Sequence, residues 1–569
     1  MKIALLQLNA RLADPEANGR AAEAAYGDAV ARGAELVLAP ELHLPGYLAE
    51  DRLWEPGLRR RLEAEAARLA ALSGPVPLIF GTASPAPSGR LFNELWWCEG
   101  GRVRQRIRKR LLPSYDVFDE HRYFEPWPEA APLVEFRGER IGVSICEDLW
   151  SDPGLVRGPV RYAVDPIAEL KALGATLILN ASASPAHLGS WLPPGRSASW
   201  AVPSKDAQRK TLLLGLARKH GIPLAYADRV GSESWLIFDG GSGLAMPDGG
   251  WQGAEPFAEG VTLVDTAAKG ASWRTLEEGP WLRKALTLGL QDNLAKQGLD
   301  AVIVGLSGGI DSAVVGALAA EALGPGRVLG VALPTRFSSG ESFDLAEQEA
   351  RHLGMPFLKL DADAPYAGFA AAMAGAFPGR SFSLTDENLQ SRSRGALLMA
   401  LSSESEVHQR LGSPKVCVLN TGNKSEAATG YFTLYGDGIG AFGLLGDCLK
   451  ARVRALAVEL GDAIPAGVLH RPPTAELRPG QTDEASLAPY TQLDAILGAA
   501  LEAQRPEEGL GEDLALLLDG EDLSQARAAL PRLLGLLRRA EFKRRQLPFA
   551  LKVSPKAFGW GRRIPLTGV

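Results

Sequence analysis

The sequence has few of the residues that mark disulfide-bonded, metal-binding or membrane-spanning proteins. Four cysteines occur in 569 residues, and no two are spaced as a zinc site or a redox pair would be. So few thiols in so long a chain are typical of a reducing compartment. No apolar run approaches the roughly 20 residues that a membrane-spanning helix requires. We therefore expect a cytoplasmic protein that has no membrane partner.

An excess of positive charge is also missing. The 61 Lys and Arg are outnumbered by 67 Asp and Glu, and the net charge of −6 argues against general nucleic-acid binding. The N-terminal MKIALLQLNA has a short apolar run without a signal-peptide cleavage pattern and is typical of a first strand. Because 569 residues are too many for one hydrophobic core, we expect two or three domains.

The chain contains two series in which apolar strands alternate with helix-like segments. In the first, strands are predicted at 3–8, 35–39, 77–82, 141–145, 175–180 and 223–227, with a closing hairpin at 239–253. In the second, strands are predicted at 301–306, 327–333, 356–361 and 415–420, with helices at 311–323 and 341–353. The order of strands and helices in the second series implies a parallel sheet with crossover helices. The expected organisation is a domain at 1–265, a linker at 266–280, a domain at 281–569, and a polar surface loop within 372–414.

Three side chains of the first series combine reactive chemistry with a position at a strand end or on a buried face. Glu41 follows the predicted strand in LVLAPELHLPGY, and Cys146 ends the strand in IGVSICEDLW. In RVRQRIRKRLLPSYDVFDE, five arginines between 102 and 110 have even numbers and share one face of a strand, which places Lys109 on the other face with apolar neighbours. The arginine face itself is explained by solvation or by an anion patch.

A thiol, a carboxylate and an inward lysine suit the hydrolysis of an amide. The thiolate attacks the amide carbon, the carboxylate accepts and returns a proton, and the ammonium stabilises the tetrahedral oxyanion. Taken singly, Cys146 is also explained as a core thiol and Glu41 as a surface or capping residue. Only the three segments together favour a Cys-Glu-Lys site.

These segments resemble the nitrilase, or carbon-nitrogen hydrolase, family over roughly residues 1–265. The matching pieces are APELHLPGY, KRLLPSYDVFDE and CEDLW. The resemblance implies a four-layer αββα sandwich in which Cys146 is the nucleophile, Glu41 the general base and Lys109 the oxyanion stabiliser. The remaining thiols match no motif and are interpreted as core residues: Cys98, Cys417 and Cys448.

The form of the second piece is similar to the glutaminase branch of this family, which implies that Tyr115 and Ser184 bind glutamine. In the family, a lysine or arginine that pairs with the glutamine α-carboxylate follows SPxHxG directly, but an uncharged serine stands there in this chain. Counting back from ARKHGIPLAYAD places Lys205 in register, so residues 190–204 are predicted to be an inserted, ordered surface loop. Lys205 is the candidate for the carboxylate and Arg196 the weaker one. The alternative is that Lys205 is a solvated lysine at a helix start.

The stretch IVGLSGGIDSAVV, residues 303–315, is a glycine-rich turn between a strand and a helix. Backbone N–H groups and the helix dipole face such a turn, and Gly308 and Gly309 allow the backbone to approach phosphate closely. Asp311 offers a carboxylate for Mg²⁺. A Walker loop has a lysine after its glycines, whereas Ile310 and Asp311 stand here, so transfer of a γ-phosphate is the weaker interpretation. A turn that binds no ligand is the alternative.

The SGGxDS loop resembles that of N-type ATP pyrophosphatases, which adenylate a carboxylate or carbonyl and release pyrophosphate. Four further stretches narrow the resemblance to the NAD synthetase family. They are TDENLQSRSRGALLMAL (385–401), TGNKSEAATGYFTLYGDGIG (421–440), RPPTAELRPGQTDEASLAPY (471–490) and EFKRRQ (541–546). The resemblance implies a second α/β domain with a parallel sheet, of the adenine nucleotide alpha hydrolase type. The link from Leu401 to Val416 is longer than is usual in the family.

The resemblance carries binding roles onto individual residues of the second domain. It implies that ATP contacts Gly305, Leu306, Ser307, Gly308, Gly309, Ile310, Asp311, Ser312, Thr421, Lys450 and Thr474. It implies that deamido-NAD contacts Asn388, Glu426, Tyr431, Phe432, Thr433, Leu434 and Lys543, and that Asp311 and Glu426 hold Mg²⁺. The segment 541–569 has seven Lys or Arg and a single acid, which suits a basic clamp on phosphates, with simple solvation as the alternative.

Together, the two resemblances imply a ligase with two activities. The second domain adenylates the nicotinate carboxylate of deamido-NAD with ATP, and the first domain frees ammonia from glutamine to attack the adenylate, which gives NAD⁺. Two alternatives remain: another glutamine-dependent ligase with a different carboxylate acceptor, and a first domain that serves only as a scaffold or binding module. We also expect the chain to form a homo-oligomer.

Overall fold

The computed structural model describes residues 1–155, 160–474, 476–478, 481, 484 and 487–567. The chain folds into two compact units. The first comprises Met1–Ala186 and Ser204–Thr275, and the second comprises His187–Pro203 and Leu276–Val569. The boundary between the two units lies at Thr275–Leu276, within the segment expected to be a linker. The short segment His187–Pro203 is an exception, because it interrupts the first unit in sequence but belongs to the second. We call this segment the strap.

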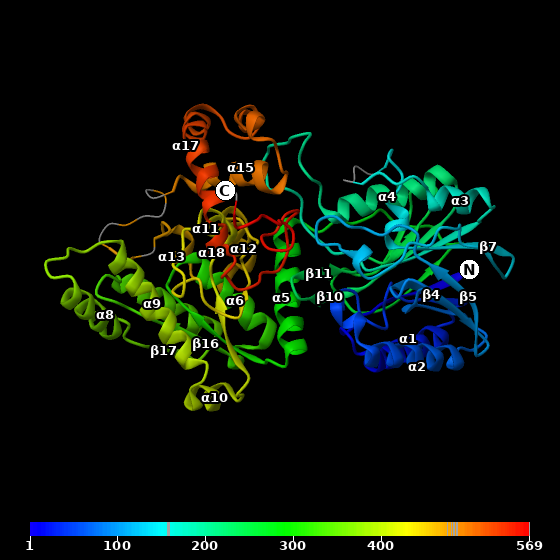
Figure 1. The fold of residues 1–569 in the computed structure, drawn as a ribbon, viewed down its shortest axis with the longest axis horizontal. Coiled ribbons are helices and arrows are strands. Elements are labelled where there is room, and N and C mark those ends of the chain that lie inside the picture. The colour runs from blue at the N-terminus through cyan, green and yellow to red at the C-terminus, as the bar shows by residue number, and fades with distance from the viewer. Residues whose placement is uncertain (156–159, 475, 479–480, 482–483, 485–486, 568–569) are drawn as a thin grey trace. The chain divides into compact units, whose positions relative to one another are not determined.

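Two six-stranded sheets form the middle of the first unit (Figure 1). One sheet runs, in spatial order, β14 (Gly260–Asp265), β1 (Lys2–Gln7), β2 (Leu36–Leu38), β3 (Leu78–Pro85), β4 (Leu91–Glu99) and β5 (Arg102–Arg108). The other runs β13 (Trp251–Gly253), β12 (Gly243–Ala245), β9 (Leu224–Asp228), β8 (Leu177–Ser182), β7 (Glu139–Ile145) and β6 (Val134–Phe136). A separate hairpin consists of β10 (Val230–Glu233) and β11 (Leu236–Asp239).

Helices cover the outer face of each sheet, which confirms the predicted αββα sandwich (Figure 1). The helices on the first sheet are α1 (Pro15–Ala31) and α2 (Pro56–Leu72), and those on the second are α3 (Pro166–Ala172) and α4 (Lys205–His220). Between the sheets lies a core of aliphatic side chains that includes Leu5, Leu38 and Leu179. This core fixes the strand ends that carry the candidate residues of the first unit.

The second unit is built on a five-stranded parallel sheet, as the alternating order predicts. It runs β17 (Phe357–Lys359), β16 (Val328–Ala332), β15 (Ala301–Gly305), β18 (Val416–Asn420) and β19 (Phe442–Gly443). The helices that accompany it are α5 (Glu278–Gln297), α6 (Ile310–Leu323), α7 (Gly340–Leu353), α8 (Asp363–Ala376), α9 (Leu384–Leu401), α10 (Ser405–Leu411), α11 (Lys424–Thr429), α12 (Lys450–Leu460) and α13 (Ala466–His470). The strand order reverses between β15 and β18, and ligands of open parallel sheets bind at the carboxyl ends of strands beside such a reversal.

A group of helices near the C-terminus completes the second unit, and we call it the helical cap. It comprises α15 (Tyr490–Leu497), the π-helical turn Gly498–Glu502, α16 (Leu510–Asp513), α17 (Gly520–Arg539) and α18 (Glu541–Arg544). Apolar side chains of these helices form one core, to which Trp191 of the strap contributes a buried indole. The predicted surface insertion is therefore ordered, but one of its tryptophans belongs to the core.

The prediction of a surface loop within 372–414 is wrong for most of its length. This segment contains all of α9 and α10. In α10, the Glu404 side chain caps the N-terminus, Val407 and Leu411 are buried four residues apart, and Gly412 ends the helix in a left-handed conformation. A single apolar pair in a charged stretch is a weak periodic signal for a helix. The polar composition of the stretch therefore led to the prediction of a loop.

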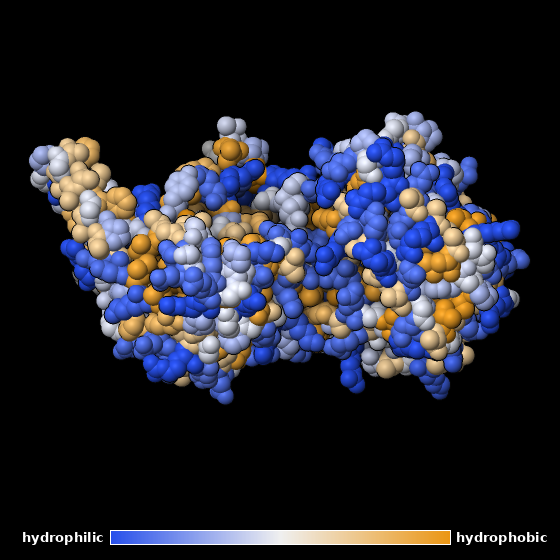
Figure 2. All heavy atoms as spheres, turned by 90° about the horizontal axis from the view of Figure 1, so that it is seen from below, coloured by the Kyte–Doolittle hydropathy of each residue, from blue (hydrophilic) through white to orange (hydrophobic). Residues whose placement is uncertain are grey.

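The surface of the protein mixes polar and apolar patches. Among the residues that the structure describes, no helix combines the length and the hydropathy needed to cross a bilayer. Figure 2 shows an apolar projection at the end of the molecule where α8 lies in Figure 1. On α8 only Tyr366 is buried, and Phe369 is 46% exposed. This helix therefore contributes little to the core of the second unit.

Two cations of the basic C-terminal segment are internal rather than solvated. Arg544 is buried and donates hydrogen bonds to two carbonyl oxygens of α11. Lys552 is buried and donates to the carbonyl oxygens of Ser554 and Pro555. These two side chains hold main chain in place, whereas Lys543 of the same segment lines a cavity of the second unit.

Glu349 is a buried carboxyl group on α7 that has no hydrogen-bond partner among the described residues. Its side chain lies against Gly316 of α6 and near Met355. Burial raises the pKa of Glu349 from 4.5 to about 8. The unfolded chain therefore ionises this group from about pH 4.5 upward, whereas the folded protein keeps it protonated to about pH 8.

We predict that Glu349→Met stabilises the protein increasingly as the pH rises from about 5 to about 8. Below this range both states of the wild-type protein hold the proton, and above it both have lost the proton, so the pH-dependent difference levels off. Urea unfolding between about pH 5 and 9 measures it, with an expected gain on the order of a few kcal/mol near pH 8. Glu347→Gln, at a half-exposed position of the same helix, is the control. A gain that is the same at every pH would contradict the prediction.

Candidate active sites

Glu41 lies just after β2, in a tight loop that passes over β3. A β-carbon at Gly81 would lie 2.2 Å from the Leu42 nitrogen, so only glycine lets the loop pass this close. The Glu41 carboxylate is buried and accepts hydrogen bonds from Asn93 Nδ2 at 2.7 Å and from the Ala183 amide at 3.0 Å. Its orientation is therefore fixed both by β4 and by the segment that follows β8.

Cys146 follows β7 and begins a short 3₁₀ helix, Cys146–Leu149. Its φ is +43°, a left-handed conformation that costs a non-glycine residue on the order of 1–3 kcal/mol. Asp148 holds this turn, because its carboxylate accepts the Ile145 amide at 3.0 Å and the Leu111 amide at 2.9 Å. Cys146 is only 4% exposed. Strained residues of this kind cluster at functional sites.

Lys109 points inward, as the alternation along the strand predicts, and joins two carboxylates. Its Nζ lies 2.6 Å from Glu41 Oε1 and 2.8 Å from Glu120 Oε1. Glu120 also accepts a hydrogen bond from Tyr47 OH at 2.7 Å. All four side chains are buried. Sequence reasoning did not single out Glu120, although it is the last residue of the motif KRLLPSYDVFDE.

Burial and charge set the protonation of this cluster. Burial and the carboxylate of Glu41 raise the pKa of the Cys146 thiol well above its ordinary value, against the opposing effect of Lys109. Burial lowers the pKa of Lys109, but Glu120 and Glu41 outweigh it, so the pKa is raised and the ammonium stays charged. Burial also raises the pKa of Glu120 to about 7. The resting thiol is therefore protonated and needs a base when it attacks.

A further acid and two tyrosines surround the thiol. Glu147 is buried and accepts hydrogen bonds from Tyr115 OH at 3.0 Å and from Tyr162 OH at 2.7 Å. Burial raises the pKa of Glu147. Burial and the charge of Glu147 raise the pKa of Tyr115. Because Glu147 directly follows Cys146, the hydrogen bond to Glu147 holds Tyr115 beside the segment that carries the thiol. Sequence reasoning missed Glu147, whose only signal is its place directly after Cys146.

Lys205 is the first residue of α4 and lies near the same acid. Its Nζ is 3.7 Å from the centre of the Trp150 ring. Burial and the charge of Arg209 lower the pKa of Lys205 to about 8, against the opposing effect of the Glu147 carboxylate. The structure thus packs Lys205 against Trp150, which lies four residues after Cys146.

The two other residues that were considered for binding glutamine lie in different units of the protein. Ser184 is buried just after β8, and its amide donates to Asp228 Oδ1 at 2.9 Å. Arg196 lies in the strap, where it forms an ion pair with Asp519 of the second unit. Ser184 therefore belongs to the first unit, whereas the weaker candidate for the glutamine carboxylate is engaged elsewhere.

In the second unit, the loop after β15 is held by hydrogen bonds that its own serine hydroxyl groups make with its main chain. Ser312 Oγ accepts the Ser307 amide at 3.1 Å and donates to the Gly309 carbonyl at 3.0 Å. Gly308 has a φ of +72°, and a β-carbon there would lie 2.4 Å from the Ser342 carbonyl oxygen. Helix α6 begins directly after these glycines, so its N-terminus faces the mouth of the loop.

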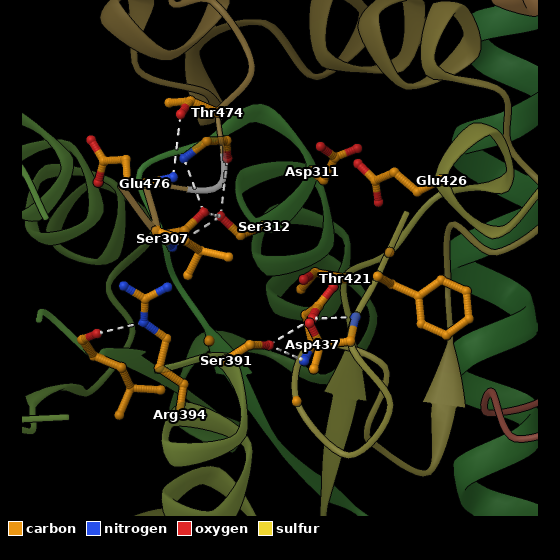
Figure 3. A pocket seen from close by; sticks show the side chains of 18 of the residues that line it. Ser307, Asp311, Ser312, Ser391, Arg394, Thr421, Glu426, Asp437, Thr474 and Glu476 are labelled. Carbon is orange, nitrogen blue, oxygen red and sulfur yellow. Dashed lines mark hydrogen bonds between the residues drawn. The ribbon is translucent and has the colours of Figure 1, made fainter. Parts of the chain in front are cut away.

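The carboxyl ends of β15, β16 and β18 open into a cavity of ≈ 690 Å³ (Figure 3). Its lining includes the residues predicted for ATP at Gly305, Leu306, Ser307, Gly309, Ile310, Asp311, Ser312, Thr421, Lys450 and Thr474. It also includes those predicted for deamido-NAD at Asn388, Glu426, Tyr431, Phe432, Thr433 and Lys543. Two predicted residues, Gly308 and Leu434, do not line it. One cavity therefore brings together both predicted ligand sets.

Two carboxylates from different helices meet at one side of this cavity (Figure 3). Asp311 of α6 and Glu426 of α11 both face Lys450, whose Nζ pairs with Asp311 and lies 3.8 Å from Glu426 Oε1. Asn423 Nδ2 donates to Asp311 Oδ1 at 3.0 Å. Among the described residues, no group of three or more His, Cys, Asp or Glu could hold a metal ion. A carboxylate pair fits an ion that takes its other ligands from phosphates and water, as Mg²⁺ does.

The residues predicted for the dinucleotide are held by neighbouring main chain and side chains. Lys543 Nζ donates to the carbonyl oxygens of Gly430 at 2.8 Å and of Phe432 at 2.6 Å. Thr433 Oγ1 donates to Asn388 Oδ1 at 2.8 Å. The cavity wall that they form joins α9, the segment after α11 and α18.

Two polar residues that sequence reasoning missed also face the cavity (Figure 3). Asp437 Oδ1 accepts a hydrogen bond from Ser391 Oγ at 2.6 Å. Arg394 Nε donates to the Leu333 carbonyl oxygen at 3.0 Å, and burial lowers the pKa of Arg394. Both lie inside motifs of the second domain, but a motif does not tell which of its polar side chains faces a ligand.

The two units match two different protein families. Residues 2–275 match the carbon-nitrogen hydrolase family, and residues 282–546 match the NAD synthase family. The strained thiol, the buried Lys109 and the cavity above the parallel sheet lie within these two matches. The class of protein is therefore a carbon-nitrogen hydrolase joined to an NAD synthase.

Relatives match along the whole chain. One from Synechocystis sp. is 38% identical over 99% of this chain and 98% of its own, and one from Thermotoga maritima is 33% identical over 100% and 98%; both are named glutamine-dependent NAD(+) synthetase. The solved structure of a glutamine-dependent NAD⁺ synthetase from Acinetobacter baumannii, in complex with ADP, matches with a TM-score of 0.73 and 30% identity over 99% of this chain and 98% of that one. The chain belongs to the family of glutamine-dependent NAD⁺ synthetases.

Proposed function

We propose that the protein catalyses the ATP-dependent amidation of deamido-NAD to NAD⁺ with ammonia that its first unit releases from glutamine. The observation that carries the proposal is the full-length match to relatives named for this reaction, in a chain that holds both an amidase-type cluster and a nucleotide-type loop. The ADP complex of the Acinetobacter relative supports ATP as the activating substrate.

In the first unit, Cys146 is the nucleophile. Its Sγ attacks the amide carbon of glutamine, Glu41 accepts the thiol proton and passes it to the departing nitrogen, and Lys109 stabilises the oxyanion. Ammonia leaves and a thioester remains on Cys146. Glu41 then activates water, which releases glutamate and restores the thiol. Glu120 keeps the ammonium of Lys109 charged, which the oxyanion requires.

Glutamine is oriented by groups of opposite charge around the thiol. The Lys205 ammonium binds the α-carboxylate, and the Glu147 carboxylate, held by Tyr115, offers a partner for the α-amino group. Ser184 supplies a polar group beside them. The proximity of Lys205 and Glu147, whose charges act on each other, supports this arrangement.

We predict that Lys205→Ala raises the KM for glutamine by about 10- to 100-fold, because a charged hydrogen bond contributes about 1.5–3 kcal/mol. Synthesis from added ammonia should not change. In the wild-type enzyme the KM for glutamine should rise as the pH passes about 8, where the ammonium loses its proton. Lys210→Ala, at an exposed position of the same helix, is the control. An unchanged KM in Lys205→Ala with a raised KM in Arg196→Ala would move the role to the strap.

In the second unit, ATP activates the nicotinate carboxylate. A carboxylate oxygen attacks the α-phosphorus of ATP and pyrophosphate leaves; ammonia then attacks the acyl carbon of the adenylate and AMP leaves. The loop amides and the N-terminus of α6 bind the phosphates, with Lys450, Thr421 and Thr474 as donors. Asp311 and Glu426 would hold Mg²⁺, which supplies positive charge to the phosphates. Asn388, Lys543 and the segment 431–434 bind deamido-NAD.

We also propose that the enzyme works in the cytoplasm as a homo-oligomer. The four cysteines, all buried and none in a disulfide, support a reducing compartment. Light scattering of the purified protein tests the oligomeric state, and a monomer at assay concentration would contradict that part of the proposal.

The direct test is mass-spectrometric detection of products from deamido-NAD, ATP, Mg²⁺ and glutamine labelled with ¹⁵N in its amide. NAD⁺ carrying the label, AMP, pyrophosphate and glutamate are expected. If ammonia and ATP amidate a different carboxylate but not deamido-NAD, the protein is another ligase. If no glutamate forms, the first unit is a scaffold.

A further inference from the structure

The strap is anchored in the second unit although its sequence interrupts the first. It is closed on itself, because the Ser190 amide donates to the Val202 carbonyl at 2.9 Å and the Val202 amide donates to Ser190 Oγ at 3.1 Å. The Leu188 amide donates to the Val553 carbonyl at 2.9 Å. The strap is therefore an ordered loop held by the second unit, while the chain on both sides of it belongs to the first.

Trp191 is the anchor of the strap. Its side chain is buried in the core of the helical cap, in the same cluster as Tyr490 and Leu497. Its amide donates to Glu502 Oε2 at 2.7 Å. Its carbonyl oxygen lies so close to Gly498 that a β-carbon there would be 2.5 Å away. Side chain and main chain of Trp191 are thus both fixed by the cap.

Glu502 connects this anchor to the segment that forms the nucleotide cavity. It is buried, and its Oε1 accepts a hydrogen bond from Lys424 Nζ at 2.8 Å. Lys424 is the first residue of α11, directly after Asn423, which donates to Asp311. The same helix carries Glu426. A movement of α11 therefore acts on Glu502 through a buried ion pair.

A second contact links the strap to α12. Arg452 is buried and donates to the Gly189 carbonyl oxygen at 2.6 Å, and it lies 3.4 Å from Glu502. Arg452 follows Lys450, the cavity residue that pairs with Asp311, by two positions on the helix. Two of the three helices that supply candidate phosphate or metal ligands thus hold the strap: α12 directly through Arg452, and α11 through Lys424 and Glu502.

Each end of the strap lies close in sequence to a residue that is predicted to bind the substrate glutamine. Just before it, the Ala183 amide donates to Glu41 and the Ser184 amide donates to Asp228. Just after it, α4 begins at Lys205. A displacement of the strap therefore reaches a residue predicted to bind glutamine on each side, over a few residues of main chain.

We propose that the strap positions Ser184 and Lys205 according to the state of the nucleotide cavity, with Trp191 and Glu502 as positioning residues. The proposal rests on the proposed function, because it needs both activities in one chain. Binding of a nucleotide draws Lys450 from Asp311 to the phosphates, and this change acts on α11 and α12. Close-packed interiors pass such changes on rather than absorb them. Because Trp191 is buried, the strap follows the helices that hold it.

The test compares glutamate release by Trp191→Ala and wild-type enzyme, with and without ATP plus deamido-NAD. We expect the nucleotides to accelerate glutamate release in the wild type and this acceleration to fall by about tenfold in the variant. Glutamate release without nucleotides and NAD⁺ synthesis from added ammonia should stay within about twofold of the wild type. Trp191→Phe should restore the acceleration, because it keeps an aromatic side chain and the amide donor.

Gly498→Ala tests the same contact from the other side, since its methyl group meets the Trp191 carbonyl oxygen. It should also lower the acceleration, and Trp54→Ala, a partly exposed tryptophan of the first unit, should not. An acceleration that both strap variants retain overturns the proposal, as does a wild type without acceleration. If the strap variants lose NAD⁺ synthesis equally with glutamine and with ammonia, the strap has only a structural role, and this result also overturns the proposal. If the wild type makes no NAD⁺, the proposed function itself fails.

Discussion

Cys146→Ala is expected to lower NAD⁺ synthesis from glutamine by at least about 10⁴-fold and to leave synthesis from added ammonia intact. The thiol is the nucleophile proposed for the first unit, and Glu41 and Lys109 can only assist an attack that it makes. Its removal leaves the cavity of the second unit unchanged, since the described residues that line the cavity all belong to the second unit. Parallel assays with glutamine and with ammonium chloride measure the split.

Cys98→Ala is the matched control for this prediction. Cys98 is also a buried thiol of the first unit, so its loss leaves a similar cavity without touching the reactive cluster. It should lower thermal stability slightly and leave both assays near the wild-type rate. If Cys146→Ala lost both activities equally, the idea of two separate sites would have to be abandoned.

The cluster around Cys146 could be predicted in part because its members stand at strand ends or on alternating faces. Periodicity turns Lys109 inward, and the ends of two strands hold Glu41 and Cys146. Glu120 and Glu147 carry no such periodic signal. Each acquires its place only from tertiary contacts, through Tyr47 and the tyrosines around the thiol, which no local pattern encodes.

The same limit appears in the second unit. The strand, the glycine turn and α6 were predictable because local conformation and hydropathy define them. The roles of Arg394 and Asp437 at the cavity were not, because a side chain on a polar helix or loop faces a ligand only through the packing of its neighbours.

The strap shows how tertiary context overrides composition. Its prolines, serines and glycine are typical of a surface loop, and most of it is partly or fully exposed. The Trp191 side chain is nevertheless buried in an apolar cluster about 300 residues away in sequence, and Leu192 and Trp200 pack against the same cluster. Neither the core cluster of the cap nor the carboxylate of Glu502 is visible from the strap sequence.

Asp311→Asn is expected to lower NAD⁺ synthesis from both nitrogen sources by at least about 100-fold, which corresponds to the loss of a few kcal/mol of transition-state stabilisation. The amide keeps the shape of the side chain but removes the negative charge that faces Lys450 and that would hold Mg²⁺ with Glu426. Glutamate release without nucleotides should survive, because the thiol cluster belongs to the first unit.

The measurement that separates charge loss from misfolding is pyrophosphate release from ATP and deamido-NAD in the absence of any nitrogen source. Asp311→Asn should abolish it, whereas Asp344→Asn, an exposed carboxylate on α7, should not. Both variants should melt near the wild-type temperature, since Asn retains an acceptor for Asn423. Because the adenylate must form before any nitrogen attacks it, normal turnover of Asp311→Asn with ammonia would show that the SGGID loop is not where the phosphates are activated.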